Sequence, residues 1–134
     1  QPAIGVTWYE AQAYAAAHQA RLLTLNERLF VMRGDANRPY PWGQPFGYAN
    51  ANTAEEGLGK PVAVGLFRSD CTPEGVYDLA GNVAEWTSDE ADDEVVIHPG
   101  SWTSPSMSSW AKARALVPRK TRSADLGFRI VRDL

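Results

Sequence analysis

Hydrophobic residues recur at helical spacing in two short segments near the start of the chain. In the first segment, Thr7 and Glu10 stand three residues apart, which is the spacing of a capping box at a helix N-terminus. The alanine-rich run that follows places Trp8, Ala11 and Ala15 on one face of a helix. This pattern predicts a first helix that packs closely against its neighbours.

The second segment repeats the same device over a shorter length. Thr24 and Glu27 form another capping box, and Leu25, Leu29 and Met32 follow at positions i, i+4 and i+7. A glycine two residues after Met32 supplies the stop signal. The chain is therefore expected to begin with two capped helices.

Prolines and glycines recur throughout residues 35–75, too often for long helices or strands, so this part is expected to form loops. Residues 89–94 read as an acidic turn, and the β-branched run 95–97 reads as a short strand. Four apolar residues near the C-terminus are expected to be core positions of closing strands. They are Ala113, Leu116, Phe128 and Ile130.

Length and charge limit the classes of function. The 134 residues suffice for one domain with a single core, and no apolar run approaches the length of a membrane span. We expect a soluble protein that does not insert into membranes, and the single Cys71 favours the cytoplasm over an oxidising compartment. The net charge of −3 combines an acidic middle with a basic end, so the middle fits a cation and nucleic-acid binding is not expected.

Residues 75–89 carry glycines, carboxylates and aromatics at fixed offsets, and the rest of the chain is organised around them. Asp78 and Glu85 are hard oxygen donors, and Gly81 lets the backbone turn between them so that main-chain carbonyls face the same point. Such a set would half-enclose a calcium ion. The alternative is a tight turn ahead of a strand, with the apolar side chains in the core and the acids in water.

The same stretch resembles the G-x-Y-D/N-x-x-G-N-x-x-E-W signature of the formylglycine-generating enzyme (sulfatase-modifying factor) family, which also ends in the G-F-R tripeptide present here at 127–129. Further matches follow in order at 6–11, 21–24 with 33–34, 40–43, 51–53 and 100–102. The resemblance implies an α+β, C-type-lectin-like fold with two helices, a small mostly antiparallel sheet and much irregular loop.

The resemblance covers almost all of residues 6–131 and implies a single domain over 1–134. Family members usually have further structure before the 6–11 segment. We therefore expect this domain to be the C-terminal part of a longer chain, or to associate with an upstream domain or a partner chain. The family usually carries proline, glutamate and tryptophan where this chain has Leu23, Leu25 and Arg28, a departure that we interpret as a repacked helix face.

The resemblance also implies two structural calcium sites. The first matches the central stretch at Asp78, Gly81, Val83 and Glu85. The second matches the loop at Asn52, Thr53, Glu56 and Leu58. For the second site the alternative is a solvated acidic loop.

The family's oxidase chemistry depends on two cysteines, five residues apart, that hold a copper ion. Those positions fall on Ser104 and Ser109 here, and Cys71 matches neither of them. A hydroxyl is hard and un-ionised at neutral pH, whereas Cu(I) selects the soft thiolate, so we expect no copper and no catalysis. The alternative is a divergent formylglycine-generating oxidase that acts on a protein cysteine.

Large apolar side chains alternate with small hydroxyls in the segment 102–112, as in binding loops. The pattern is similar to the variable proteins of diversity-generating retroelements, which present a ligand-binding face in this part of the same fold. We therefore expect a non-catalytic module that binds a protein ligand. The expected face comprises Trp102, Thr103, Ser104, Ser106, Met107, Ser108, Ser109, Trp110 and Lys112.

Overall fold

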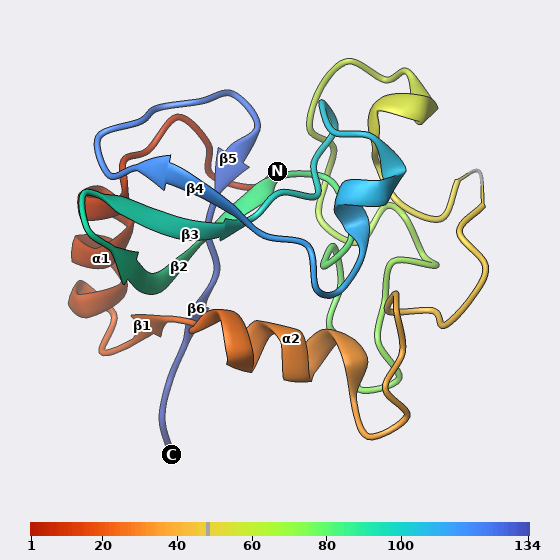
Figure 1. Cartoon of the computed structure of the whole chain (residues 1–134), viewed down its shortest axis with the longest axis horizontal. Helices are drawn as coiled ribbons and strands as arrows, with labels where there is room; N and C mark the ends of the chain where they lie inside the picture. The colour runs from red at the N-terminus through yellow and green to blue at the C-terminus, as the bar shows by residue number, and fades with distance from the viewer. Residues whose placement is uncertain (48) are drawn as a thin grey trace.

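The computed structural model describes residues 1–47 and 49–134, which form two α-helices, two small β-sheets and long loops (Figure 1). Helix α1 spans Trp8–Ala17 and helix α2 spans Leu25–Arg33. Both predicted capping boxes are confirmed, because Thr7 and Thr24 each exchange hydrogen bonds with the glutamate three residues later. Helix α1, the longer of the two, has ten residues, and no helix in the described part of the chain is long and apolar enough to cross a bilayer.

The larger sheet has four strands in the order β4-β3-β2-β5. Its strands are β2 (Ala84–Ala91), β3 (Glu94–His98), β4 (Ala115–Pro118) and β5 (Leu126–Gly127). Strand β3 pairs antiparallel with β2 and β4, and β5 runs parallel to β2. The smaller sheet joins β1 (Arg21–Leu22) to β6 (Ile130–Val131) in antiparallel register. The expected α+β class with mostly antiparallel pairing is confirmed.

Two local predictions were wrong. The acidic segment 89–94 is not one turn, since β2 continues to Ala91, which pairs with Glu94 across a hairpin whose Asp92 adopts φ 55°. Leu116 was assigned to the core but is exposed, because β4 turns Ala115 and Val117 toward the core instead. Successive side chains of a strand point to opposite faces, so a register error of one residue reverses every position.

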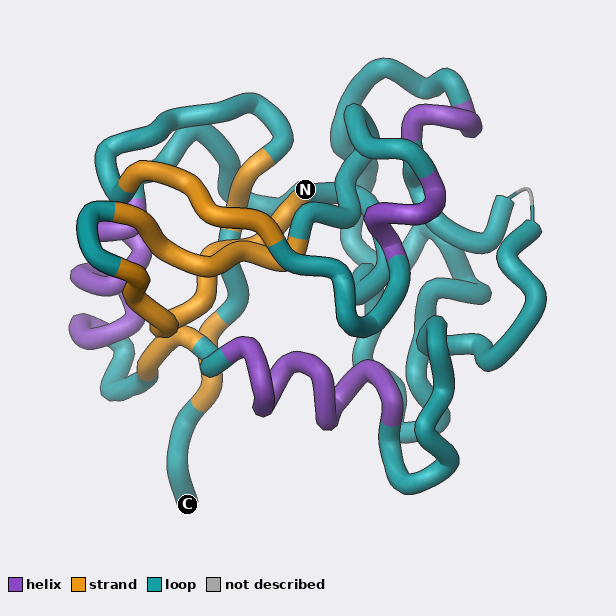
Figure 2. The backbone as a smooth tube through the Cα atoms, in the orientation of Figure 1, coloured by secondary structure: helices purple, strands orange, loops and turns teal. Residues whose placement is uncertain are grey.

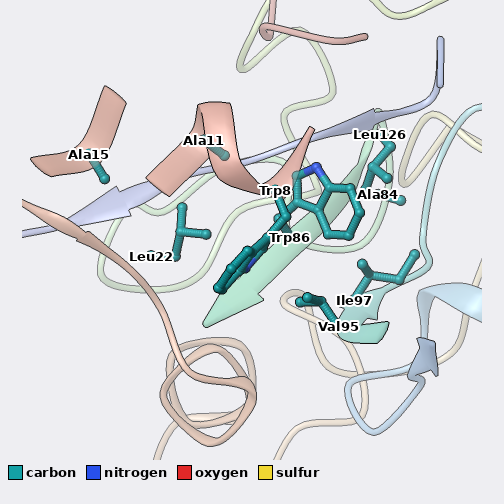
Figure 3. Packing of buried hydrophobic residues seen from close by; sticks show 9 residues of the cluster. All are labelled: Trp8, Ala11, Ala15, Leu22, Ala84, Trp86, Val95, Ile97 and Leu126. Carbon is teal, nitrogen blue, oxygen red and sulfur yellow. The ribbon is translucent and has the colours of Figure 1, made fainter. Parts of the chain in front are cut away.

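The main core lies between helix α1 and the larger sheet. Trp86 on β2 is almost completely buried, and it lies beside Trp8 of α1 in the cluster drawn in Figure 3. The two indole N–H groups donate to main-chain carbonyls, Trp8 to Thr87 at 2.9 Å and Trp86 to Val6 at 3.0 Å. These bonds satisfy the polar edge of each ring, so both tryptophans can be buried without an unpaired donor.

Loops dominate the other half of the molecule, as predicted for residues 35–75 (Figure 2). The described part of that range contains only one helical turn, the 3-10 helix η1 (Ala54–Glu56), and a second turn η2 (Ser106–Ser109) lies in the later loop. A smaller core anchors these loops to α2. Its buried members are Met32, Ala51, Leu79, Ala80 and Ala111.

Candidate functional site

The turn of the central stretch is built by residues that adopt positive φ and by one close backbone approach. Asp78 (φ 58°) and Asn82 (φ 73°) make the turn, whereas Gly81 does not have positive φ. A Cβ on Gly81 would lie 2.7 Å from the carbonyl oxygen of Asn52. Position 81 therefore requires glycine because the loop around Asn52 packs directly against it. The sequence had suggested a different reason, that glycine is needed for the backbone to turn at this position.

Asp70 holds this turn from inside the protein. Its carboxylate accepts hydrogen bonds from the main-chain N–H groups of Leu79, Ala80 and Gly81, at 3.0–3.1 Å. Burial raises the pKa of Asp70 to about 7, although the bonds from Ala80 and Gly81 act in the opposite direction. The folded state therefore binds this proton more tightly than the unfolded chain, and the contribution of Asp70 to stability is lost as the pH rises toward 7.

Glu85 lies at the centre of a buried charge cluster. Its Oε2 accepts from Nε of Arg28 at 2.7 Å, and its Oε1 accepts from Nε and Nη2 of Arg129 at 2.9 and 2.7 Å. Burial alone raises the pKa of Glu85, but the two guanidinium groups outweigh it and lower the pKa to about 2. The Glu85 side chain is 5% exposed, so the acid is neither in water nor free of partners.

Arg28 enters this cluster from helix α2. A repacked helix face does not describe Arg28, because its side chain is 3% exposed and forms an ion pair with Glu85. Its Nη2 also donates to the carbonyl of Leu79 at 2.7 Å, and its Nη1 lies 3.9 Å from the sulfur of Met32. A helix face predicted to be apolar therefore delivers a cation to the central turn.

The four residues of the first predicted calcium site lie close together, but they do not all fit a metal shell. Asp78 and Val83 line a cavity of about 470 Å³ together with Glu85 and Arg129, and Gly81 lies in the adjoining turn. Asp78 Oδ2 accepts from the Gly65 N–H at 2.9 Å, and burial raises the pKa of Asp78. Because both oxygens of Glu85 bind arginines, a calcium ion that uses this carboxylate does not fit the site.

The second predicted calcium site fits better. Asn52 is 1% exposed, and its Oδ1 accepts no hydrogen bond among the residues that the structure describes, while its Nδ2 donates to Lys60 and Asn82. The hydroxyl of Thr53 is likewise buried without a partner in the described chain. A buried acceptor without a donor is costly, and a hard cation would satisfy it.

The other two members of this site lie farther out. Glu56 is half-buried and accepts from the main-chain N–H of Ala49, and Leu58 is exposed. Within residues 1–47 and 49–134, no group of three or more His, Cys, Asp or Glu side chains could hold a metal ion. A calcium shell here would depend mainly on amide and main-chain oxygens.

The segment 102–112 is fixed at its base by buried polar contacts. His98, which is fully buried, lies with Nε2 3.0 Å from the carbonyl of Trp110, and its Nδ1 accepts from the Gly100 N–H at 3.4 Å. Burial lowers the pKa of His98 to about 3, so the ring is neutral and Nε2 carries the proton. The Ser104 hydroxyl donates to Pro99 O at 2.7 Å, and Ser109 is fully buried.

The outer part of the segment exposes large apolar side chains. Met107 is 76% exposed and Trp110 is 45% exposed, with the Lys112 ammonium 5.9 Å from the Trp110 ring centroid. Trp102 is half-buried and donates from Nε1 to Ala124 O. Among the predicted polar members, Thr103 is exposed and Ser106 and Ser108 are half-buried. The predicted face thus combines an exposed rim with a buried base.

A family model for the sulfatase-modifying factor enzyme 1-like domain matches residues 1–134. The chain belongs to this family. The inactive C-alpha-formylglycine-generating enzyme 2 of Bos taurus is 33% identical over 149 residues, which cover 96% of this chain and 49% of the relative. This chain therefore spans about half the length of that relative.

Two solved structures extend the likeness of this sulfatase-modifying factor domain. PvdO from Pseudomonas aeruginosa matches with a TM-score of 0.88 and 28% identity over 100% of this chain and 62% of that one. Treponema denticola variable protein 1 matches with a TM-score of 0.71 and 25% identity over 83% of this chain and 46% of that one. These neighbours confirm the C-type-lectin-like, formylglycine-generating-enzyme type of fold.

Sequence reasoning missed the roles of Asp70 and Arg28 in this sulfatase-modifying factor domain, and it did not place His98 at the base of the segment 102–112. Asp70 falls in the range that was expected to form loops, and Arg28 in the helix face that was expected to be repacked. The only local signal for Asp70 is an acid placed a few residues before a glycine-rich turn. Arg28 and His98 act on residues distant in sequence, and a single sequence carries no signal for such pairs.

Asp125 was missed as well. Its carboxylate accepts from the hydroxyls of Thr103 and Ser123, and Ser101 lies at 3.5 Å from it. The main chain at 104 and 106 is tied to the second predicted calcium loop, because Ser104 O accepts from Ala54 N at 2.9 Å. The segment 102–112 is thus held on two sides by the rest of the domain.

Proposed function

We propose that this sulfatase-modifying factor domain is a non-catalytic binding module that recognises a protein ligand through the segment 102–112. The observation that carries the proposal is the exposure of Met107 and Trp110 on a segment whose base is fixed by hydrogen bonds of His98 and Ser104. Exposed aromatic and thioether side chains on a rigid base are typical of protein-binding hot spots, because little ordering is needed on association.

The serines support a role other than oxidation. Ser104 donates to a main-chain carbonyl, and the Ser109 hydroxyl is buried, so neither presents a soft ligand for copper. The name of the Bos taurus relative, an inactive enzyme, and the likeness to a variable protein from Treponema denticola agree with this reading. The alternative remains a divergent oxidase that acts on a protein cysteine.

The shape of the segment favours a protein over a small molecule. Met107 projects into solvent, and Ser106 of the segment lines an open hollow of about 280 Å³ with Phe46 and two glutamates. A small-molecule site buries most of its ligand in a concave, mainly apolar pocket. An exposed apolar rim instead suits a partner that covers it.

A calcium ion at the second predicted site, in the loop that carries Asn52, would stabilise the conformation of the segment 102–112. The loop that carries Asn52 is bonded to the binding segment, since Ala54 N donates to Ser104 O and Glu55 accepts from Ser106 N at 2.8 Å. An ion held by Asn52, Thr53, Glu56 and the Leu58 carbonyl would therefore stiffen the segment. We expect ligand binding to weaken when calcium is removed.

A peptide-display selection tests the proposal. Peptides selected on the whole domain are expected to lose at least about tenfold in affinity for Met107→Ala or Trp110→Ala, the size of a modest hot spot. Leu116→Ala is the matched control, because Leu116 is also exposed but lies on β4. Equal binding by all variants, or conversion of a peptide cysteine to formylglycine by the copper-treated protein, would contradict the proposal.

A further inference from the structure

The central turn already contains its own cations. Arg28 and Arg129 come from helix α2 and from the C-terminal segment, 101 positions apart in the numbering, and they meet at the two oxygens of Glu85. Both guanidinium groups are largely withdrawn from water, with side-chain exposures of 3% and 25%. These charge-assisted hydrogen bonds between Glu85 and the two arginines therefore lie inside the fold and not on its surface.

The arginines also bind the main-chain carbonyls of the turn. Nη2 of Arg28 donates to Leu79 O at 2.7 Å, and Nη2 of Arg129 donates to Tyr77 O at 3.1 Å and to Asp78 O at 3.0 Å. One carboxylate and three carbonyls therefore converge on positive charge. A carboxylate with main-chain carbonyls is also the donor set that calcium requires, although the carbonyls predicted to bind that ion were those of Gly81 and Val83.

We infer that Arg28 and Arg129 are the permanent cations of the central turn, so that the site around Glu85 folds without calcium. Two buried guanidinium groups repel a divalent ion, and each oxygen of Glu85 already accepts charge-assisted hydrogen bonds at 2.7–2.9 Å. Arg28 is the decisive residue, because it alone reaches Glu85 Oε2 among the described side chains.

The inference limits where calcium can act in this chain. If the domain binds calcium at all, the ion is held by the loop that carries Asn52, and this second statement rests on the proposed function. Asn52 Oδ1 is a buried acceptor without a donor in the described residues, whereas both carboxylate oxygens of Glu85 are satisfied. The two predicted calcium sites therefore differ: guanidinium groups fill one, and the other retains a free oxygen.

Calcium titration of the chelator-stripped domain by calorimetry tests the inference on the wild-type chain. We expect at most one calcium ion to bind per chain. Its affinity should fall by at least about tenfold in Asn52→Ala and stay within about twofold of the wild-type value in Asp78→Asn. No binding at all would leave the inference intact and overturn only the calcium part of the proposed function. Two ions per chain, or a single ion lost in Asp78→Asn, would overturn the inference.

Substitution of Arg28 gives the complementary test. Arg28→Met removes the charge at similar length and is expected to add one bound calcium ion per chain, while Arg28→Lys keeps a cation and is expected to add none. Circular dichroism establishes that each variant is folded before titration. A folded Arg28→Met that binds no additional calcium would contradict the role of Arg28, and if the variant does not fold, the wild-type titration decides alone.

Discussion

The turn around Glu85 and the segment 102–112 differ in which side chains they bury. At the turn, Glu85 and Asp70 are buried and every oxygen of the two carboxylates accepts a hydrogen bond. On the segment, apolar side chains face solvent and the buried Ser109 hydroxyl has no partner among the described residues. The turn is specified by interlocking charges, whereas the outer segment has few contacts that depend on side-chain identity.

The two regions are nevertheless joined through the main chain. Trp102 N donates to Asn82 O at 2.9 Å, and a Cβ on Gly100 would lie 2.2 Å from the carbonyl oxygen of Ala80. These contacts use backbone atoms, so they hold the segment in place whatever side chains it carries. A binding surface needs a rigid support beneath side chains that can be replaced, and the turn and the segment 102–112 together provide this arrangement.

The largest expected effect comes from removing the charge of Glu85. Glu85→Gln leaves the buried guanidinium group of Arg28 and the partly buried one of Arg129 without a counter-charge, which should lower the free energy of unfolding by about 3–5 kcal/mol. Chemical denaturation followed by tryptophan fluorescence measures this loss. The control is Glu10→Gln, which breaks the exposed pair with Arg122 and should have a far smaller effect. Similar losses in both variants would mean that the buried cluster contributes little.

Asp70→Asn should have the next largest effect. At pH 5 the carboxyl group of Asp70 is neutral in the fold and both of its oxygens can still accept hydrogen bonds. The amide nitrogen of an asparagine cannot accept, so at least one of the three main-chain N–H groups loses its acceptor. We expect a loss of about 1–3 kcal/mol in the free energy of unfolding at pH 5. Asp93→Asn, on the exposed hairpin, is the matched control. A stability within error of wild type would show that the turn does not depend on Asp70.

The comparison also explains which parts of the fold could be predicted from sequence. Both helices were found because capping boxes are local signals, since the two residues that bond are three positions apart. The strand 95–97 and the loop-rich range 35–75 were found from β-branched and Pro/Gly content for the same reason. The exposed residues Met107 and Trp110 of the candidate face also agree with their prediction.

The remainder depends on contacts between distant segments. Glu85 meets Arg28 and Arg129 across 57 and 44 positions, so no local pattern could decide between a metal and an arginine as its partner. Strands β5 and β6 have two residues each, too short for any period, and Leu116 was misassigned by a single position. The local pattern singled out Glu85, but it carried no signal for the two arginines that bind its carboxylate.

His98, which links the sheet to the segment, should make stability depend on pH. The pKa of His98 is about 3 in the folded state, against 6.5 for an ordinary histidine. Below pH 6.5 this histidine is therefore protonated in the unfolded chain but stays neutral in the folded protein until the pH approaches 3. The contribution of His98 to stability should therefore fall as the pH drops from 6.5 toward 3, by about 1 kcal/mol over the first unit, while buried Asp70 acts in the opposite direction over the same range. This part of the pH dependence should disappear in His98→Gln and persist in His18→Gln, as urea titrations can measure. An unchanged profile in His98→Gln would mean that His98 is protonated in the fold.

The smallest effect on stability is expected at the rim, and it separates the two regions most clearly. Met107→Ser and Trp110→Ser remove side chains that are 76% and 45% exposed, while the Trp110 carbonyl that contacts His98 belongs to the main chain and stays in place. We expect each variant to stay within about 0.5 kcal/mol of the wild-type stability, as surface changes usually do, while its binding of selected peptides falls. Thermal melts beside binding titrations measure both quantities, and Leu116→Ser should preserve both. A loss of stability above about 2 kcal/mol would make Met107 and Trp110 part of the core and would remove the physical basis for a replaceable binding rim.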